Sequence, residues 1–212
     1  MPEGSLRGDG SSWDVETAHF AERFQLFMII ALGEAIVVTG ATAAALDFDA
    51  ARIGALSIAF LSSAALWWLY FGYVASLAEK RLEREAKDRT RLARDGYTYL
   101  HLGFVAGIML VAVGDEIVIH HPTDVLTAPE IAVVVIGPAV YLLAHTLFRL
   151  RMARSLSTKR LTGALACLAL AAIGPFVPAI VLLLSTLCVL VAVIGVERVA
   201  ARHLPTAAHT AP

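Results

Sequence analysis

Long stretches of apolar residues, separated by short polar segments, divide the chain. An α-helix that crosses the ~30 Å hydrocarbon core of a bilayer needs about 20 mainly apolar residues. We therefore expect a membrane-spanning helix in each stretch. The stretches cover residues 20–43, 51–78, 96–119, 129–149, 161–175 and 178–197. This pattern predicts an all-α fold, a polytopic transmembrane helical bundle with about six spans.

The boundary between the last two predicted helices depends on a few residues. Leu161 to Val196 is one apolar run that only Gly174, Pro175 and Pro178 interrupt. A single helix of this length would measure about 54 Å, well beyond the hydrocarbon core. A hairpin at 174–178 with a short fifth helix is the better interpretation, and a broken or re-entrant pair is the alternative.

The Lys and Arg residues between the stretches predict the orientation. They are frequent in 79–95 and 149–160 and absent from 120–128 and 175–178. Because cytoplasmic loops of membrane proteins are enriched in basic residues, both termini are predicted to be cytoplasmic. The predicted organisation is a polar N-terminal segment (1–19), a transmembrane domain (20–197) with a cytoplasmic charged loop (79–95), and a cytoplasmic, disordered tail (198–212).

The composition supports a membrane protein. Hydrophobic residues make up 58% of the chain and charged residues 17%, and the mean hydropathy is +0.72. The net charge of −1 and the grouping of basic residues in two loops argue against a nucleic-acid partner. Residues 1–19 lack the pattern of a removable signal peptide, so we expect the first helix to direct insertion. The predicted partner is the lipid bilayer.

An acidic residue, Glu34, lies near the middle of the first predicted helix. An ionised carboxylate at the centre of a bilayer is costly, which makes Glu34 a candidate transport site. Arg23 lies eleven residues earlier on the same helical stripe, about 16 Å away along the axis, and His19 extends that stripe. Glu22 joins this group at the membrane boundary. The alternatives are a hydrogen-bonded Glu34 that only holds helices together and an interfacial anchor formed by the boundary residues.

A second group of polar residues repeats at helical spacing near the predicted cytoplasmic side. Tyr141, His145 and Arg149 are four residues apart, as are Tyr97 and His101. Imidazoles near a membrane carboxylate can relay protons, because the ordinary pKa of His is about 6.5. The alternative is that these side chains supply interfacial hydrogen bonds between helices.

Four glycines are predicted to allow close helix packing. Gly33 adjoins Glu34, and Gly40 follows seven residues later. Gly103 and Gly107 form a GxxxG motif, which is typical of closely packed membrane helices.

The sequence favours neither a metal site nor an enzyme. His, Asp and Glu residues occur, but without a metal-ligand spacing, and Cys167 and Cys188 lie singly inside apolar stretches. No nucleophile elbow, phosphate loop or nucleotide fingerprint is present. We expect no metal and no cofactor, and consider an intramembrane enzyme that acts on lipid the least favoured reading.

Four segments carry a resemblance to a known family. HFAERFQLFMIIALGEAIVVTGATAA (19–44), LWWLYF (66–71), RDGYTYLHLGFVAGIML (94–110) and YLLAHTLFRLR (141–151) resemble blocks of the bacterial low temperature requirement A family, in the same order. The resemblance implies a polytopic membrane protein named for growth in the cold, without a settled biochemical activity. The positions that match the family's motif are His19, Glu22, Arg23, Gly33 and Glu34. Gln25 and Gly72 depart from it.

The resemblance also implies that family members are longer than this chain, which is similar to their C-terminal half. The leading hypothesis is a multi-pass protein of the bacterial cytoplasmic membrane that is transporter-like. Glu34 is its midplane site, Arg23, His101 and His145 are candidate partners, and a small solute or a proton is the cargo. The alternatives are a non-enzymatic structural or cold-adaptation membrane protein and a truncated family member. A homo-oligomer is also expected, since two such units would form a bundle of transporter size.

Overall fold

The computed structural model describes residues 17–47, 49–74 and 99–202, and all regular structure in these residues is helical. This confirms the predicted all-α class. The long helices are α1 (Thr17–Ala44), α2 (Ala50–Leu69), α5 (Leu100–His120), α6 (Ala128–Ala153), α7 (Thr158–Ala169) and α8 (Ala179–Arg202). A π-helical turn, η1 (Tyr70–Val74), continues α2, and two 3₁₀ turns, η3 (Leu170–Ala172) and η4 (Gly174–Phe176), follow α7.

Five helices in the described residues are long and apolar enough to cross a membrane. They are Glu22–Ala44, Ala50–Gly72, Leu100–His120, Ala128–Met152 and Ala179–Ala200. The predicted polytopic bundle is therefore confirmed, with one refinement. α7 has 12 residues and so measures about 18 Å, too short to span as an α-helix. The expected short fifth helix is thus α7 plus its 3₁₀ turns, which lead into α8 around Gly174 and Pro178.

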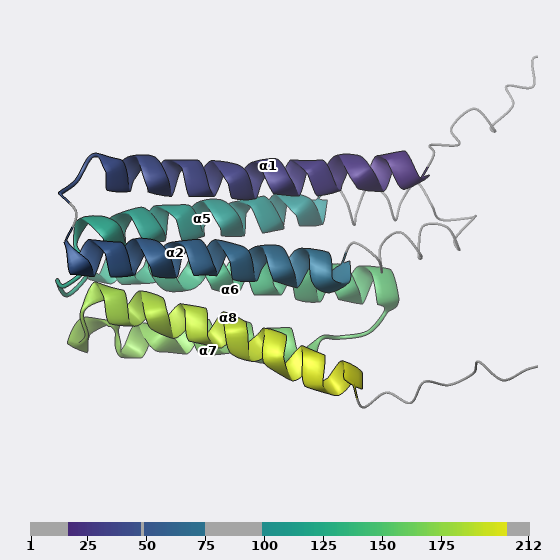
Figure 1. Cartoon of the computed structure of the whole chain (residues 1–212). Coiled ribbons are helices and arrows are strands. Elements are labelled where there is room, and N and C mark those ends of the chain that lie inside the picture. Colours follow the sequence, from purple (N-terminus) through teal and green to yellow (C-terminus); the bar gives the residue numbers. More distant parts are fainter. Residues whose placement is uncertain (1–16, 48, 75–98, 203–212) are drawn as a thin grey trace, which may run out of the picture.

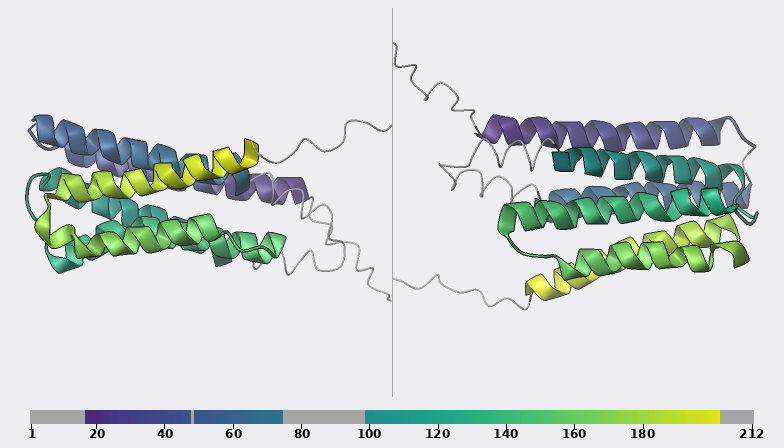
Figure 2. Two further views of the ribbon diagram at one scale, coloured as in Figure 1. Left: turned by 90° about the horizontal axis from the view of Figure 1, so that it is seen from below. Right: turned by 180° about the vertical axis from the view of Figure 1, so that it is seen from behind.

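The helices run roughly along one common axis (Figure 1). α1 lies on one side of the bundle and the α7–α8 pair on the opposite side, with α2, α5 and α6 between them (Figure 2). α1, α5 and α7 begin at one end, where α2, α6 and α8 finish (Figure 1). We call this the basic end, because the Arg-rich segment 149–160 lies there, and the other end the short-loop end. That the basic end faces the cytoplasm stays a prediction, and the expected loop 79–95 lies outside the described residues.

α5 and α6 form the closest helix pair, and glycine makes this possible. A Cβ atom at Gly107 would lie 2.8 Å from the backbone nitrogen of Tyr141, and one at Gly103 would lie 3.1 Å from the Cβ of Ala144. From the other helix, a Cβ atom at Gly137 would lie 2.7 Å from the backbone nitrogen of Val111. Both glycines of the GxxxG motif therefore face α6. By contrast, a Cβ atom at Gly33 or Gly40 would meet nothing within 4 Å.

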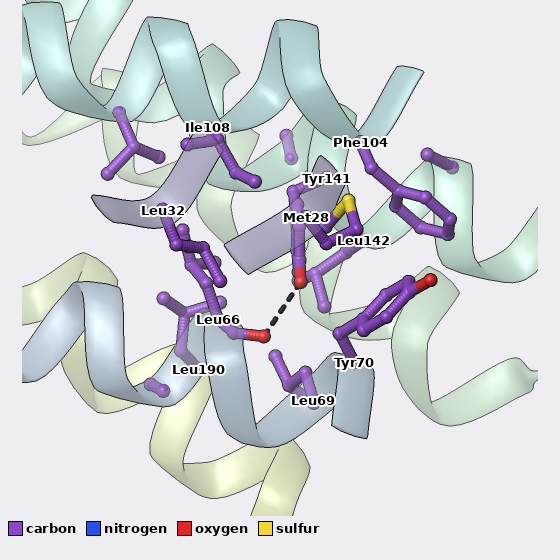
Figure 3. Packing of buried hydrophobic residues seen from close by; sticks show 14 of the residues in the cluster. Met28, Leu32, Leu66, Leu69, Tyr70, Phe104, Ile108, Tyr141, Leu142 and Leu190 are labelled. Atoms are coloured by element: carbon purple, nitrogen blue, oxygen red, sulfur yellow. Dashed lines mark hydrogen bonds between the residues drawn. The ribbon is translucent and has the colours of Figure 1, made fainter. Parts of the chain in front are cut away.

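The interior at the basic end combines apolar and aromatic side chains. Met28, Leu66, Phe104 and Leu142 belong to one buried cluster (Figure 3). Tyr141 lies in the same cluster, and its hydroxyl donates a hydrogen bond of 2.7 Å to the backbone carbonyl of Leu66. α6 is thereby joined to α2 in the core.

Local interactions fix the helix starts at the short-loop end. Thr127 and Glu130 form a capping box at the start of α6, which satisfies backbone N–H groups that otherwise lack partners. The backbone N–H groups of Ala179 and Ile180 donate to the carbonyls of Asp124 and Pro122. The start of α8 is therefore attached to the loop between α5 and α6.

Candidate functional site: a buried polar cluster

A buried arginine occupies the first turn of α7. The side chain of Arg160 is 2% exposed, and its Nε and Nη2 atoms donate to the two carboxylate oxygens of Glu197 on α8 at 2.7 and 2.8 Å. Such bidentate pairs between guanidinium and carboxylate are strong and directional. The pair connects the two arms of the α7–α8 hairpin at the basic end.

Arg160 also contacts α6 and α2. Its Nη1 atom lies 2.7 Å from Nδ1 of His145, and its Nη2 atom lies 3.4 Å from the carbonyl oxygen of Leu69. Because a guanidinium group can only donate, Nδ1 of His145 must accept, and the ring proton is on Nε2. This Nε2 atom is buried and has no hydrogen-bond partner among the described residues. One guanidinium therefore reaches α2, α6 and α8 from α7.

A second buried pair lies beside this cluster. The hydroxyl of Tyr70, in the π-helical turn, is 2.9 Å from Nε2 of His101 on α5. The ring of Phe104 lies next to both histidines, with ring-centroid distances of 5.2 Å to His101 and 4.4 Å to His145. π-helical turns often mark functional positions in membrane and soluble helices. Here the turn directs Tyr70 into the interior.

A small cavity opens next to the Arg160–Glu197 pair. Its volume is about 120 Å³, large enough for a few water molecules. The guanidinium of Arg198 lies 4.1 Å above the ring of Trp68 at this cavity. Its lining residues are Trp68, Leu69, Gly72, Arg160, Ile194, Glu197 and Arg198. Both members of the pair line the cavity, and Glu197, which is 23% exposed, is the more accessible of the two.

Another buried acid lies farther along α5. Asp115 is 1% exposed, and its Oδ1 atom has no hydrogen-bond partner among the described residues. It follows His101 by fourteen residues on α5, which corresponds to about 21 Å along the axis and a rotation of about 40°. Asp115 and His101 therefore share one inward stripe, with Asp115 toward the short-loop end.

The structure divides the residues that the sequence singled out. His101 and His145 are buried together around Phe104, whereas Arg23 and Glu34 are exposed on α1. The expected partnership of Glu34 with the two histidines is not formed, because the inward face of α1 consists of other positions. Met28, Ala31, Leu32, Ala35 and Thr39 are the buried residues of that face. Glu22 is exposed as well, and the side chain of His19 lies outside the described residues.

Sequence reasoning missed Arg160 and Glu197 as a pair. Arg160 was counted among the basic loop residues and Glu197 among the residues at the end of the last helix. Their positions in the sequence indicate the pair, because Arg160 directly precedes and Glu197 directly follows the apolar run 161–196. A hairpin folded at 174–178 brings these two ends together. Asp115 is a second acid inside an apolar stretch and belongs to the His, Asp and Glu residues that occur without a metal-ligand spacing. No group of three metal-ligand side chains occurs in the described part of the chain.

Spanning helices packed around a buried ion pair and a buried carboxyl group define a polytopic α-helical membrane protein. Residues 3–195 match the family described as bacterial low temperature requirement A protein (LtrA). The chain belongs to this family, as the resemblance of its segments predicted. It is 33% identical over 193 residues to the uncharacterized protein RA0937 of Rhizobium meliloti (strain 1021), an alignment that covers 90% of this chain and 46% of that protein. The chain thus spans about half the length of this curated relative. No solved structure matches.

Proposed function

We propose that this chain is a transporter-like protein of the bacterial cytoplasmic membrane, which moves protons, alone or together with a small solute, through the interior of its bundle. The observation that carries the proposal is Asp115, a buried carboxyl group without a hydrogen-bond partner for Oδ1 in the described residues. Ionisable side chains inside a membrane bundle are rare, and they typically mark proton or substrate pathways.

The proposed pathway has a polar group toward each end. Asp115 receives the proton toward the short-loop end, and His101 and Glu197 accept it toward the basic end. His145 helps to hold Arg160 in place, because its Nδ1 atom already accepts from that guanidinium. Phe104 and Ile108, both 0% exposed, lie between Asp115 and His101 along α5. In this conformation they form an apolar barrier, which a transporter needs to keep its two sides from being connected at once.

Glu197 is the proposed exit group. Protonation of its carboxylate would remove the charge that holds Arg160, so the bidentate pair would weaken. Arg160 contacts α2, α6 and α8, and its release would loosen the hairpin against the rest of the bundle. The ion pair is therefore proposed to couple proton arrival to helix movement.

Proton flux in liposomes tests this proposal. Purified protein is reconstituted with a pH-sensitive dye inside the vesicles, and a valinomycin-driven potassium potential supplies the driving force. We expect proton entry above that of empty vesicles, and a fall to the empty-vesicle rate in Asp115→Asn. The neighbouring acid Glu116 is half-buried and points about 100° away, so Glu116→Gln is the matched control and should keep the flux. Equal flux in Asp115→Asn and wild type would refute the pathway.

A second candidate function has its own supporting observation. The guanidinium of Arg160 is almost fully buried and contacts three other helices, an arrangement that also suits a structural membrane protein of cold adaptation. This candidate predicts that Asp115→Asn and Glu197→Gln change only the thermal stability in detergent. Complementation of a cold-sensitive strain by Asp115→Asn, together with absent proton flux in the wild-type protein, would favour it.

A further inference from the structure

α1 carries an apolar face that the rest of the described chain leaves uncovered. Ile30 is 67% and Val37 is 63% exposed, and these residues, seven apart, form the centre line of the face. α1 lies at the side of the bundle that is opposite α7 and α8 (Figures 1 and 2). Within the membrane this face meets either lipid or another protein.

The position of Glu34 distinguishes between lipid and protein as the neighbour of this face. It lies about midway along the spanning segment Glu22–Ala44 and is exposed. No hydrogen bond or ion pair joins it to any other described residue. A carboxyl group at this depth against lipid is strongly unfavourable. The face around Glu34 is therefore expected to be covered by protein.

The residues on either side of the centre line indicate that this protein is a second copy of the chain. At about 100° per residue, Gly33 and Glu34 lie on opposite sides of the line through Ile30 and Val37. Glu22 and Arg23, eleven residues earlier, lie on the same two sides as Gly33 and Glu34, and both are exposed. In a parallel pair of helices related by a two-fold axis, one side of each helix meets the other side of its partner. Arg23 then meets Glu22 of the second copy, and Glu34 meets Gly33 of the second copy.

We propose that this face of α1 is the interface of a parallel homodimer. Two symmetric Arg23–Glu22 pairs form at its basic end. Glu34 lies over Gly33 of the second copy, where a Cβ atom would find nothing within 4 Å, so there is space for the carboxyl group beside the helix backbone. Two copies together also have about the length of the Rhizobium meliloti relative, of which one copy spans 46%. The proposal is independent of the interior pathway.

Cysteine cross-linking tests the interface. Cys188 is exposed and is replaced by Ser, and single cysteines are introduced as Ile30→Cys and Val37→Cys. Mild oxidation in native membranes should give a disulfide-linked species with twice the monomer mass. Val191, 54% exposed on α8, supplies the control Val191→Cys, which should stay monomeric. Cross-linking of Ile30→Cys and Val37→Cys no greater than that of the control, or only to a protein of another mass, would overturn the homodimer.

Charge exchange tests the register. Arg23→Glu or Glu22→Arg alone places like charges opposite each other and should weaken the dimer roughly 2- to 10-fold, while the double variant restores the pairs and the wild-type dissociation constant. Glu34→Leu makes the monomer face compatible with lipid and should weaken the dimer about 3- to 30-fold, whereas Glu34→Gln keeps a hydrogen-bonding group. Helical circular dichroism confirms that each variant is folded. Failure of the double variant to recover would exclude this register.

Discussion

Removal of the Glu197 carboxylate should destabilise the protein markedly, because this carboxylate makes a bidentate pair with the buried Arg160 guanidinium. Arg160 is 2% exposed and Glu197 23%. Breaking a buried ion pair by removing one partner typically costs about 3–5 kcal/mol. In Glu197→Ala, the 120 Å³ cavity next to the pair can admit water that partly solvates the guanidinium, so we expect a cost somewhat below this range, about 2–4 kcal/mol.

The size of the thermal shift follows from this free energy. For a domain of 150–250 residues, each kcal/mol shifts Tm by roughly 2–4 °C, so Glu197→Ala should lower Tm by about 4–16 °C. Removal of both charges, in Arg160→Met with Glu197→Leu, should be much less harmful than Glu197→Ala alone, because no unpaired buried charge remains. The coupling between the two sites is read from the double-mutant cycle.

Thermal unfolding in detergent, followed by circular dichroism or by size-exclusion chromatography after heating, measures these shifts. Lys159 is the matched control, since it adjoins Arg160, is half-exposed and makes one hydrogen bond of 3.3 Å to the carbonyl of Val196. Lys159→Met should cost less than about 1 kcal/mol. If Glu197→Ala were as stable as Lys159→Met, or if the double variant were less stable than Glu197→Ala, the buried-pair reasoning would be refuted.

Three further substitutions test the packing and the local contacts, each by the same thermal measurement. Gly107→Ala should lower the free energy of unfolding by about 1–3 kcal/mol, because the added Cβ would lie 2.8 Å from the Tyr141 backbone. Gly33→Ala is the control and should not destabilise the monomer, because a Cβ there would meet nothing within 4 Å. Tyr70→Phe should cost about 0.5–1.5 kcal/mol by removing the 2.9 Å hydrogen bond to His101, and an unchanged Tm would show that this bond is not formed. Thr127→Ala should cost about 1 kcal/mol through loss of the capping box, with exposed Thr123→Ala as the neutral comparison.

Much of the fold could be predicted because the bilayer constrains it. Within a membrane, backbone polar groups must be satisfied inside the chain, so a long apolar stretch is expected to be a helix. The stretches 96–119 and 129–149 correspond to α5 and α6 within a few residues. The short α7 was harder to predict, because Leu170–Ala172 and Gly174–Phe176 tighten into 3₁₀ turns around Gly174 and Pro175, which apolar character alone does not indicate.

The candidate site could be predicted less well, because the depth of a residue in the membrane says nothing about its direction. Glu34 and Asp115 are both acids within apolar stretches, and from composition alone they are equivalent. They differ in the direction in which each side chain points from its helix axis. On α1, Ala35 is buried, whereas Glu34, one residue earlier, is exposed. Only the packing of α1 on its neighbours decides which of these adjacent positions turns inward.

The contrast between these two acids supports a separate role for each. An acid that faces the interior, as Asp115 does, can exchange a proton along the bundle without leaving its own chain. An acid that faces outward, as Glu34 does, acquires a polar environment only through a neighbouring protein. Transport through the interior and assembly through the α1 face are therefore expected to fail separately. Asp115→Asn should abolish flux in an intact dimer, and Glu34→Leu should weaken the dimer before it alters any interior contact.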